Sequence, residues 1–117
     1  MPRSSKAPEL LSDAALGSLK DLGTRLREAR LRRNWTQQET AQKVGLSESS
    51  IKKVEAGAAN ITVAAYLALL DVYGRPSALD RVFALGDDTI GEALSRAEGR
   101  RRARGPRPPG EDDEWAF

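Results

Sequence analysis

A set of polar residues between positions 37 and 53 has side chains suited to contacting another molecule through hydrogen bonds and charge. These residues are Gln37, Ser47, Glu48, Ser49, Lys52 and Lys53. The 117-residue chain contains no Cys and no His, which excludes a Cys/His zinc site, a thiol nucleophile and a Ser-His-Asp triad. It also lacks a Gly-rich phosphate loop. The sequence therefore predicts a binding protein that is not an enzyme, with no metal and no cofactor.

Apart from Gln37, these residues belong to a helix that is expected to follow the capping residue Ser47 and to continue to Ala56. Ile51, Val54 and the stem of Glu55 share the inner face. The opposite face carries Ser49, Lys52, Lys53 and Ala56, with Glu48 in the exposed first turn. A helix whose outer face is polar, short-chained and cationic can enter the major groove of DNA, which is roughly 12 Å wide.

The preceding helix is expected to start at the capping box Thr36-Gln37-Gln38-Glu39 and to run to Val44. Gly45 can end it in the left-handed conformation. The linker to the next helix is then only about three residues long, so the two helices must cross steeply. This is the geometry of a helix-turn-helix.

Three further helices are expected to enclose this pair. The first runs from Ser18, which can form a capping box with Asp21, to Arg33. Its apolar stripe is Leu19, Leu22, Leu26 and Ala29, which turns Arg25, Arg32 and Arg33 toward water. A fourth helix follows Thr62, and a short fifth covers 77–85. The sequence thus predicts an all-α fold of five helices.

The organisation along the chain is a domain between two tails. We expect a flexible arm over 1–17, a DNA-binding domain over 18–86, and a mostly disordered tail over 87–117, in which 89–97 forms an amphipathic segment. Net charge is +4 between Lys20 and Arg33, +5 between Arg96 and Arg107, and −4 between Glu111 and Glu114. No apolar run approaches the ~20 residues of a membrane span, and no signal peptide is evident, so a cytoplasmic protein without membrane contact is expected.

The stretch Thr36–Gly57 closely resembles the lambda-repressor/Cro-like (XRE) helix-turn-helix family. The matching positions are Thr36, Gln37, Ala41, Gly45, Leu46, Ser47, Ile51, Glu55 and Gly57, and the resemblance extends over about 19–85. One departure is Thr40, where the family usually keeps Leu. The resemblance implies that Gln37 grips a DNA phosphate and that Arg30 and Glu55 form an inward structural ion pair. It also implies that Ser47, Glu48, Ser49, Lys52 and Lys53 approach base edges or flanking phosphates, with Thr36, Lys43, Ser50 and Asn60 completing the candidate DNA-binding set.

The resemblance further implies a sequence-specific transcriptional repressor of bacterial type, located at the nucleoid. Such proteins bind palindromic operator DNA as homodimers, and we expect the dimer interface at Leu79, Val82, Phe83 and Leu85 because a small helical core leaves these residues poorly covered.

The Arg-rich segment and the acidic end "EDDEWAF" also resemble HipB-type antitoxins. That resemblance implies a protein that represses its own operon and neutralises a HipA-like kinase toxin, with Trp115 and Phe117 as apolar anchors for the partner. Two alternatives remain open. One is a free-standing XRE or phage-type repressor, and the other is a helix-turn-helix scaffold used only for protein docking.

Overall fold

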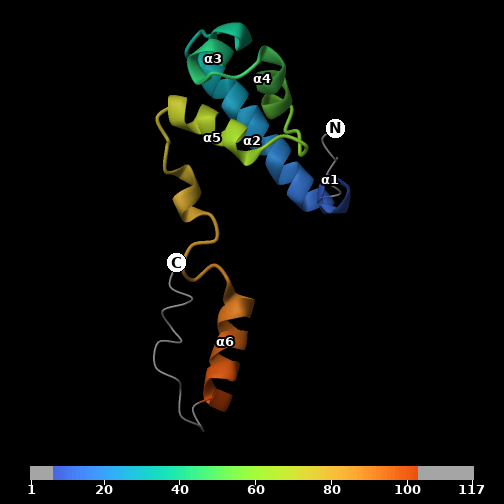
Figure 1. Cartoon of the computed structure of the whole chain (residues 1–117), viewed down its shortest axis with the longest axis vertical. Helices are drawn as coiled ribbons and strands as arrows, with labels where there is room; N and C mark the ends of the chain where they lie inside the picture. The colour runs from blue at the N-terminus through green and yellow to red at the C-terminus, as the bar shows by residue number, and fades with distance from the viewer. Residues whose placement is uncertain (1–6, 103–117) are drawn as a thin grey trace. The chain divides into compact units, whose positions relative to one another are not determined.

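The computed structural model describes residues 7–102, and every regular element among them is helical. In chain order these are α1 (Ala7–Leu10), α2 (Asp13–Arg32), α3 (Gln37–Val44), α4 (Glu48–Glu55), α5 (Val63–Val72), the 3-10 helix η1 (Ala78–Arg81) and α6 (Thr89–Arg102) (Figure 1). The described part of the chain has no strand, so the predicted all-α class is confirmed. Two compact units divide after Leu79, inside the range 18–86 that the sequence predicts as one domain.

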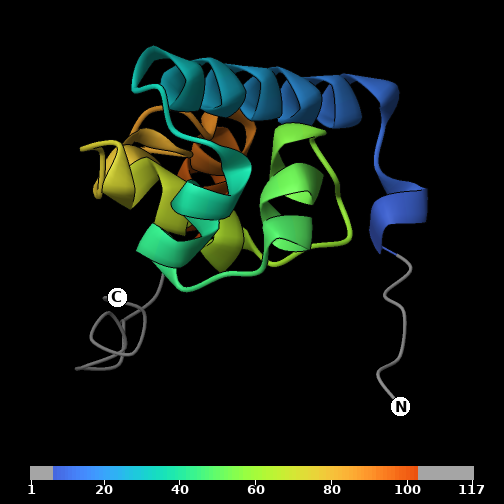
Figure 2. The ribbon, with the colours of Figure 1, turned by 90° about the horizontal axis from the view of Figure 1, so that it is seen from above.

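In the first unit the long helix α2 packs against α4, and α3 and α5 pack against α4 and against each other (Figure 2). Its core contains Leu26 of α2, Ala41 of α3, Ile51 and Val54 of α4, and Leu69 of α5. The remaining core residues are Ala65 and Tyr66 of α5. Helices α2 and α4 thus bury one apolar stripe and leave a polar face outside, whereas α5 has Asp71 as its only charged residue and exposes Val63.

The crossing of α2 and α4 depends on two glycines. A Cβ atom at Gly23 would lie 2.5 Å from the Val54 carbonyl oxygen and 2.8 Å from the Gly57 nitrogen. A Cβ atom at Gly57, whose φ is +72°, would lie 2.4 Å from the Lys20 Cα. The absence of both side chains lets the backbones approach closely, which fixes where α4 sits on α2.

The predicted ends of α3 and the predicted start of α4 are confirmed, whereas α4 ends at Glu55, one residue before the predicted Ala56. Thr36 Oγ1 accepts from the Glu39 backbone N–H at 3.0 Å, and Glu39 Oε1 accepts from the Thr36 N–H at 3.0 Å, which completes the capping box. Gly45 ends α3 with φ +71°, and Ser47 Oγ caps α4 by accepting from the Ser50 N–H at 3.0 Å. Local sequence therefore specifies the whole helix-turn-helix.

The predicted start of the first helix at Ser18 is wrong. Helix α2 begins at Asp13, because Ser12 caps it by accepting from the Ala15 N–H at 3.1 Å. Ser18 is an interior residue of α2, and α1 is also helical, so part of the range predicted as an arm is folded. Ser12 and Ser18 are both residues that can cap a helix N-terminus. The cap at Ser12 makes the helix longer by more than one turn.

Thr62 occupies the predicted N-cap position of α5, but its side chain makes no capping hydrogen bond. Helix α5 is instead anchored by Tyr66, whose hydroxyl donates to the Ala58 carbonyl at 2.6 Å. Burial raises the pKa of the Tyr66 hydroxyl above its ordinary value.

The predicted helix over 77–85 is also wrong. Only the four residues of η1 are helical, and Phe83 takes a left-handed conformation with φ +55°, which prevents a helix from continuing. In the second unit, α6 extends from Thr89 to Arg102 and so includes the first arginines of the tail predicted as disordered. The remainder of that tail and the first six residues lie outside the described residues.

Candidate nucleic-acid interface

Helix α4 presents the predicted polar face to the surface. Ile51, Val54 and Glu55 are buried, whereas Ser49, Lys52 and Lys53 are exposed. Glu48 is also exposed, in the first turn. The outer face of α4 is therefore free of apolar side chains large enough to hinder entry into a groove.

The side chains of α4 are not equivalent. Lys52 Nζ lies 3.7 Å from Glu48 Oε1, so Glu48 offsets part of the Lys52 charge. Lys53 takes part in neither the Arg30–Glu55 nor the Lys52–Glu48 ion pair. Ser50, predicted as a DNA contact, is half-buried, and its Oγ accepts a hydrogen bond from Ser47 Oγ at 2.9 Å. Ser49 and Lys53 are consequently the exposed residues of this face with the fewest competing partners.

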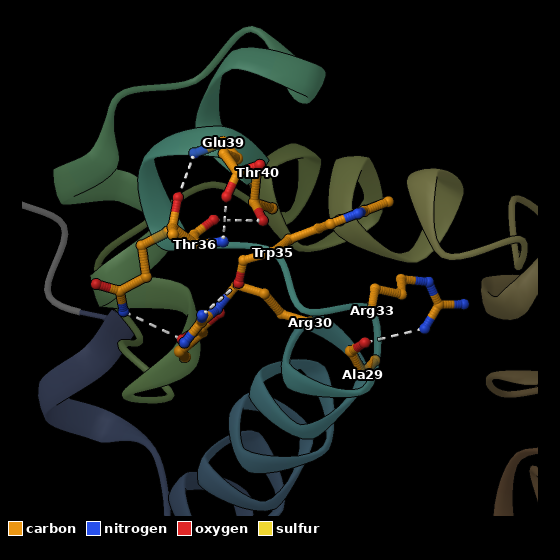
Figure 3. A network of polar contacts seen from close by, with 9 residues as sticks. Ala29, Arg30, Arg33, Trp35, Thr36, Glu39 and Thr40 are labelled. Carbon is orange, nitrogen blue, oxygen red and sulfur yellow. Dashed lines mark hydrogen bonds and ion pairs between the residues drawn. The ribbon is translucent and has the colours of Figure 1, made fainter.

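A buried network holds α4 against α2 (Figure 3). Arg30 Nε donates to Glu55 Oε2 at 2.7 Å, and Arg30 Nη2 donates to Glu55 Oε1 at 3.0 Å. The hydrogen bond to Glu55 raises the pKa of Arg30 above its ordinary value. Arg30 Nη1 also donates to the Trp35 carbonyl at 2.8 Å, so the same guanidinium fixes the turn before α3. The ion pair expected between Arg30 and Glu55 is thus present, and it is almost fully buried.

Gln37 extends this network to the surface. Its Nε2 donates to Glu55 Oε1 at 3.2 Å, and the side chain is half-buried. A primary amide has two N–H donors and one carbonyl acceptor, so the Glu55 bond leaves one donor and the acceptor for another molecule. The bond also restricts the rotamer of Gln37 at the N-terminus of α3, where helix geometry favours an anion.

Thr40, the departure from the family pattern, lies fully buried in the core. Its hydroxyl donates to the Thr36 carbonyl at 2.9 Å, so the polar atom is satisfied within α3. Together with the capping box, this hydrogen bond stabilises the first turn of α3.

An aromatic and cationic cluster supports the turn between α2 and α3. The Trp35 and Tyr73 rings lie 5.9 Å apart between centroids, and Lys43 Nζ lies 4.5 Å from the Trp35 centroid. The Arg33 guanidinium lies 4.9 Å from the Tyr73 centroid. Lys43, an exposed candidate for DNA contact, is therefore already engaged in a cation–π interaction.

A shallow hollow of about 690 Å³ lies beside the N-terminus of α3. Its lining includes the candidates Thr36, Gln37 and Glu48 together with Arg27 and Gln38, both exposed. The sequence interpretation missed Arg27, although its place one turn before Arg30 on α2 puts it near Gln37. The hollow brings one exposed cation, Arg27, onto the same surface as the amides of Gln37 and Gln38 and the N-terminus of α3.

The other predicted site residues have varied outcomes. Asn60 is exposed in the loop after α4. The residues predicted at a dimer interface are exposed by 41% at Leu79, 66% at Val82, 68% at Phe83 and 100% at Leu85. Trp115 and Phe117 lie outside the described residues.

Neither a metal site nor a membrane-spanning helix is found in residues 7–102. No group of three or more His, Cys, Asp or Glu residues in this range could hold a metal ion. Among the same residues, no helix combines the length and apolar character that a membrane crossing needs.

The chain matches the family model described as a helix-turn-helix domain over residues 21–83. It therefore belongs to the helix-turn-helix domain family, whose characteristic activity is DNA binding in transcription regulation. The matched region spans most of α2 and all of α3, α4 and α5. A search of curated proteins finds no match to the chain.

Proposed function

We propose that the protein is a sequence-specific transcriptional repressor that inserts α4 into the major groove of operator DNA. The observation that carries the proposal is the exposed face of Ser49, Lys52 and Lys53 on a helix held by the buried Arg30–Glu55 pair. Base contacts specify a sequence only when the reading side chains are held in a defined register. The buried pair supplies that register.

Phosphate contacts come from the end of α3 and from the hollow beside it. Gln37 is oriented by Glu55 and has a free N–H, and Arg27 supplies positive charge on the same surface. These contacts position the protein without reading sequence, because every phosphate is alike.

The repressor acts as a homodimer on a palindromic site, with half-sites about one helical turn apart. Exposed apolar side chains favour burial against a second copy of the chain, and they support this dimer. They are Leu79, Val82, Phe83 and Leu85, together with Ile90 and Leu94 of α6. Sedimentation should show a dimer whose dissociation increases in the Phe83→Ser, Leu85→Ser variant. A wild-type chain that stays monomeric at micromolar concentration, with and without operator DNA, would contradict the dimer.

The experiment that tests DNA reading begins with selection of a binding site from random duplexes. Wild type, Ser49→Ala with Lys53→Ala, and Gln37→Ala are then titrated against the selected duplex and an unrelated one over a range of salt. We expect the double variant to lose its preference, at about 1–3 kcal/mol for each lost base contact, and to keep weak, salt-sensitive binding. Gln37→Ala should weaken binding to both duplexes alike.

The salt dependence of DNA affinity distinguishes a DNA-binding repressor from a helix-turn-helix that serves only as a docking scaffold for proteins. Binding through phosphates weakens by roughly 0.9 log units per log unit of salt for each phosphate neutralised. A chain with no measurable affinity for any duplex at low salt would instead favour a helix-turn-helix that only docks proteins.

A narrower proposal is that the repressor is the antitoxin of a HipA/HipB-like pair and takes no part in catalysis. Its support is the sequence of the arginine run and of the acidic end with Trp115 and Phe117. Removal of residues 111–117 should weaken binding to the product of the adjacent gene and leave operator binding unchanged. If neither partner responds to the truncation, a free-standing repressor is the better assignment.

A further inference from the structure

A second hollow, of about 380 Å³, opens between α2 and the end of α5. Its apolar lining consists of Leu22, Leu26 and Ala29 from α2 with Leu70 and Tyr73 from the α5 side. Leu26 belongs to the buried core, whereas the other four are only half-buried. The hollow is therefore a place where the core of the first unit is left partly open. Its volume is near the lower end of the range for ligand sites, roughly 300 Å³.

Four arginines surround this apolar surface: Arg25, Arg32, Arg33 and Arg75. All four are exposed, and none takes part in the Arg30–Glu55 or the Lys52–Glu48 ion pair. Glu28 lies within one turn of Arg25 and Arg32 on α2, yet it pairs with neither, and the rim keeps a net positive charge. Unpaired arginines around an apolar centre match a ligand that carries carboxylates around an apolar anchor.

One of these arginines is already oriented. Arg33 Nη1 donates to the Ala29 carbonyl at 2.9 Å, and Nη2 donates to the Tyr73 carbonyl at 3.3 Å. The guanidinium also lies against the Tyr73 ring. A guanidinium held in this way loses less conformational freedom when a carboxylate binds to it.

The hollow faces away from the surface that reads DNA. Helix α4 packs on α2 at Gly23, and at 3.6 residues per turn Arg25 and Arg32 project from nearly the opposite side of α2. None of the lining residues belongs to α3 or α4. Moreover, a phosphate backbone gains nothing from a floor of Leu and Tyr, which favours a peptide over nucleic acid.

We propose that this groove binds an acidic segment of a partner protein, which inserts one large apolar side chain between α2 and α5 and pairs its carboxylates with the arginine rim. The position of the groove leaves α4 free, so the protein can hold this partner while it is bound to its operator. The inference does not rest on the proposed repressor function, because the binding is measured without DNA.

The probe is a fluorescently labelled synthetic peptide rich in Asp and Glu with one central Trp. Two control peptides replace the Trp by Ala, or the acidic residues by their amides. The full chain is tested as wild type and as two variants that remove the same charge. Arg25→Gln with Arg32→Gln alters the groove, and Arg27→Gln with Lys53→Gln alters the DNA-facing side.

We expect the groove variant to bind the acidic Trp peptide about tenfold more weakly, because two charge pairs are lost. The matched variant should bind it as wild type does, and both control peptides should bind wild type more weakly than the probe. A third variant, Ala29→Leu, places a larger apolar side chain at the bottom of the groove. It changes no charge, and leucine is compatible with the helix α2. It should weaken binding of the Trp peptide and leave binding of the Trp-free peptide unchanged, with circular dichroism confirming an intact fold.

Several results would overturn the assignment. Equal peptide affinity for both charge variants would show general attraction to a basic protein. A loss of duplex binding in the groove variant as large as in the matched variant would identify a nucleic-acid surface, and a loss of self-association would identify an interface between copies. Stronger peptide binding by Trp115→Ala with Phe117→Ala would show that the chain's own acidic end occupies the groove.

Discussion

The two units differ in whether their described residues form a buried apolar core. In the first unit Leu69 and Ile51 are fully buried, whereas in the second unit Leu85 is 100% exposed and Ile90 is 76% exposed. Capping does not separate the units, because Ser12, Thr36 and Ser47 cap helices of the first unit and Asp88 accepts from the Gly91 N–H at 3.0 Å at the start of α6. The contrast shows that an apolar periodicity yields a packed helix only where other helices supply a matching surface.

The two units also differ in the kind of surface that each is proposed to use for binding. In the first unit the outer face of α4 is polar, so the proposed contacts with DNA need no change in the core. In the second unit the apolar residues themselves are outside, which is why the proposed dimer uses them. The following predictions test how far the two regions really differ.

The largest expected effect is the loss of the buried ion pair. Arg30→Ala leaves the Glu55 carboxylate buried with only Gln37 as a remaining side-chain partner, and we expect the free energy of unfolding to fall by about 3–5 kcal/mol. Lys52→Ala removes an exposed pair with Glu48 and should cost about 1 kcal/mol or less. Denaturant unfolding measures both, and similar costs for the two variants would show that burial of the pair is unimportant.

A direct comparison of the units uses the same substitution in each. Leu69→Ala should destabilise by about 2–5 kcal/mol, because a fully buried side chain leaves a cavity. Leu85→Ala should change the stability of the monomer by no more than about 0.5 kcal/mol, because its side chain is fully exposed. The measurement is denaturant unfolding at a concentration low enough to avoid association. A large cost for Leu85→Ala would mean that the second unit has a core of its own.

Substitution by alanine should change the stability of the protein in opposite directions at two glycines of α2. Gly23→Ala places a Cβ against the backbone of α4, and we expect a loss of about 1–3 kcal/mol. Gly17→Ala meets nothing within 4 Å and should stabilise the protein by about 0.5–1 kcal/mol through helix propensity. Thermal unfolding followed by circular dichroism distinguishes the two. Stabilisation by both substitutions would disprove the close crossing of α2 and α4.

The caps offer a smaller test within the first unit. Thr36→Ala removes the hydroxyl of the capping box and should cost about 1 kcal/mol. Thr62→Ala, at an N-cap without a side-chain hydrogen bond, should change stability by no more than about 0.5 kcal/mol. If the two variants lose the same amount of unfolding free energy, the capping geometry does not account for the effect.

The capping box also predicts a modest dependence on pH. Hydrogen bonds from the Thr36 backbone and side chain lower the pKa of Glu39 below its ordinary value of 4.5. A carboxylate with a depressed pKa contributes stability above its ordinary pKa and loses that contribution as pH falls through the folded value. The stability difference between wild type and Glu39→Gln should therefore shrink below about pH 4.5. A difference that grows on acidification would contradict this assignment.

Much of the first unit could be predicted because its signals are local. The box Thr36–Glu39, the left-handed Gly45 and the cap Ser47 each act within four residues, and all three are present as predicted. The errors arose where two local signals competed, as Ser12 and Ser18 did for the start of α2, or where an apolar pattern had no packing partner, as in 77–85. Gly23 gave no readable signal, because its role depends on a helix that is distant in sequence.

The amino-acid sequence alone determined the helix-turn-helix, its inward face and the residue types on its outer face, since capping and 3.6-residue periodicity are properties of short segments. Only the tertiary structure decided which of those outer residues are free. Gln37 donates to Glu55 of α4, and Lys43 lies against the Trp35 ring, whereas the Ser47–Ser50 and Glu48–Lys52 contacts are local to α4 and its cap. The tertiary structure also left an arginine-rimmed groove between α2 and α5. These non-local outcomes depend on the angle at which helices cross, and that angle is set by close backbone contacts such as the one at Gly23 and Gly57.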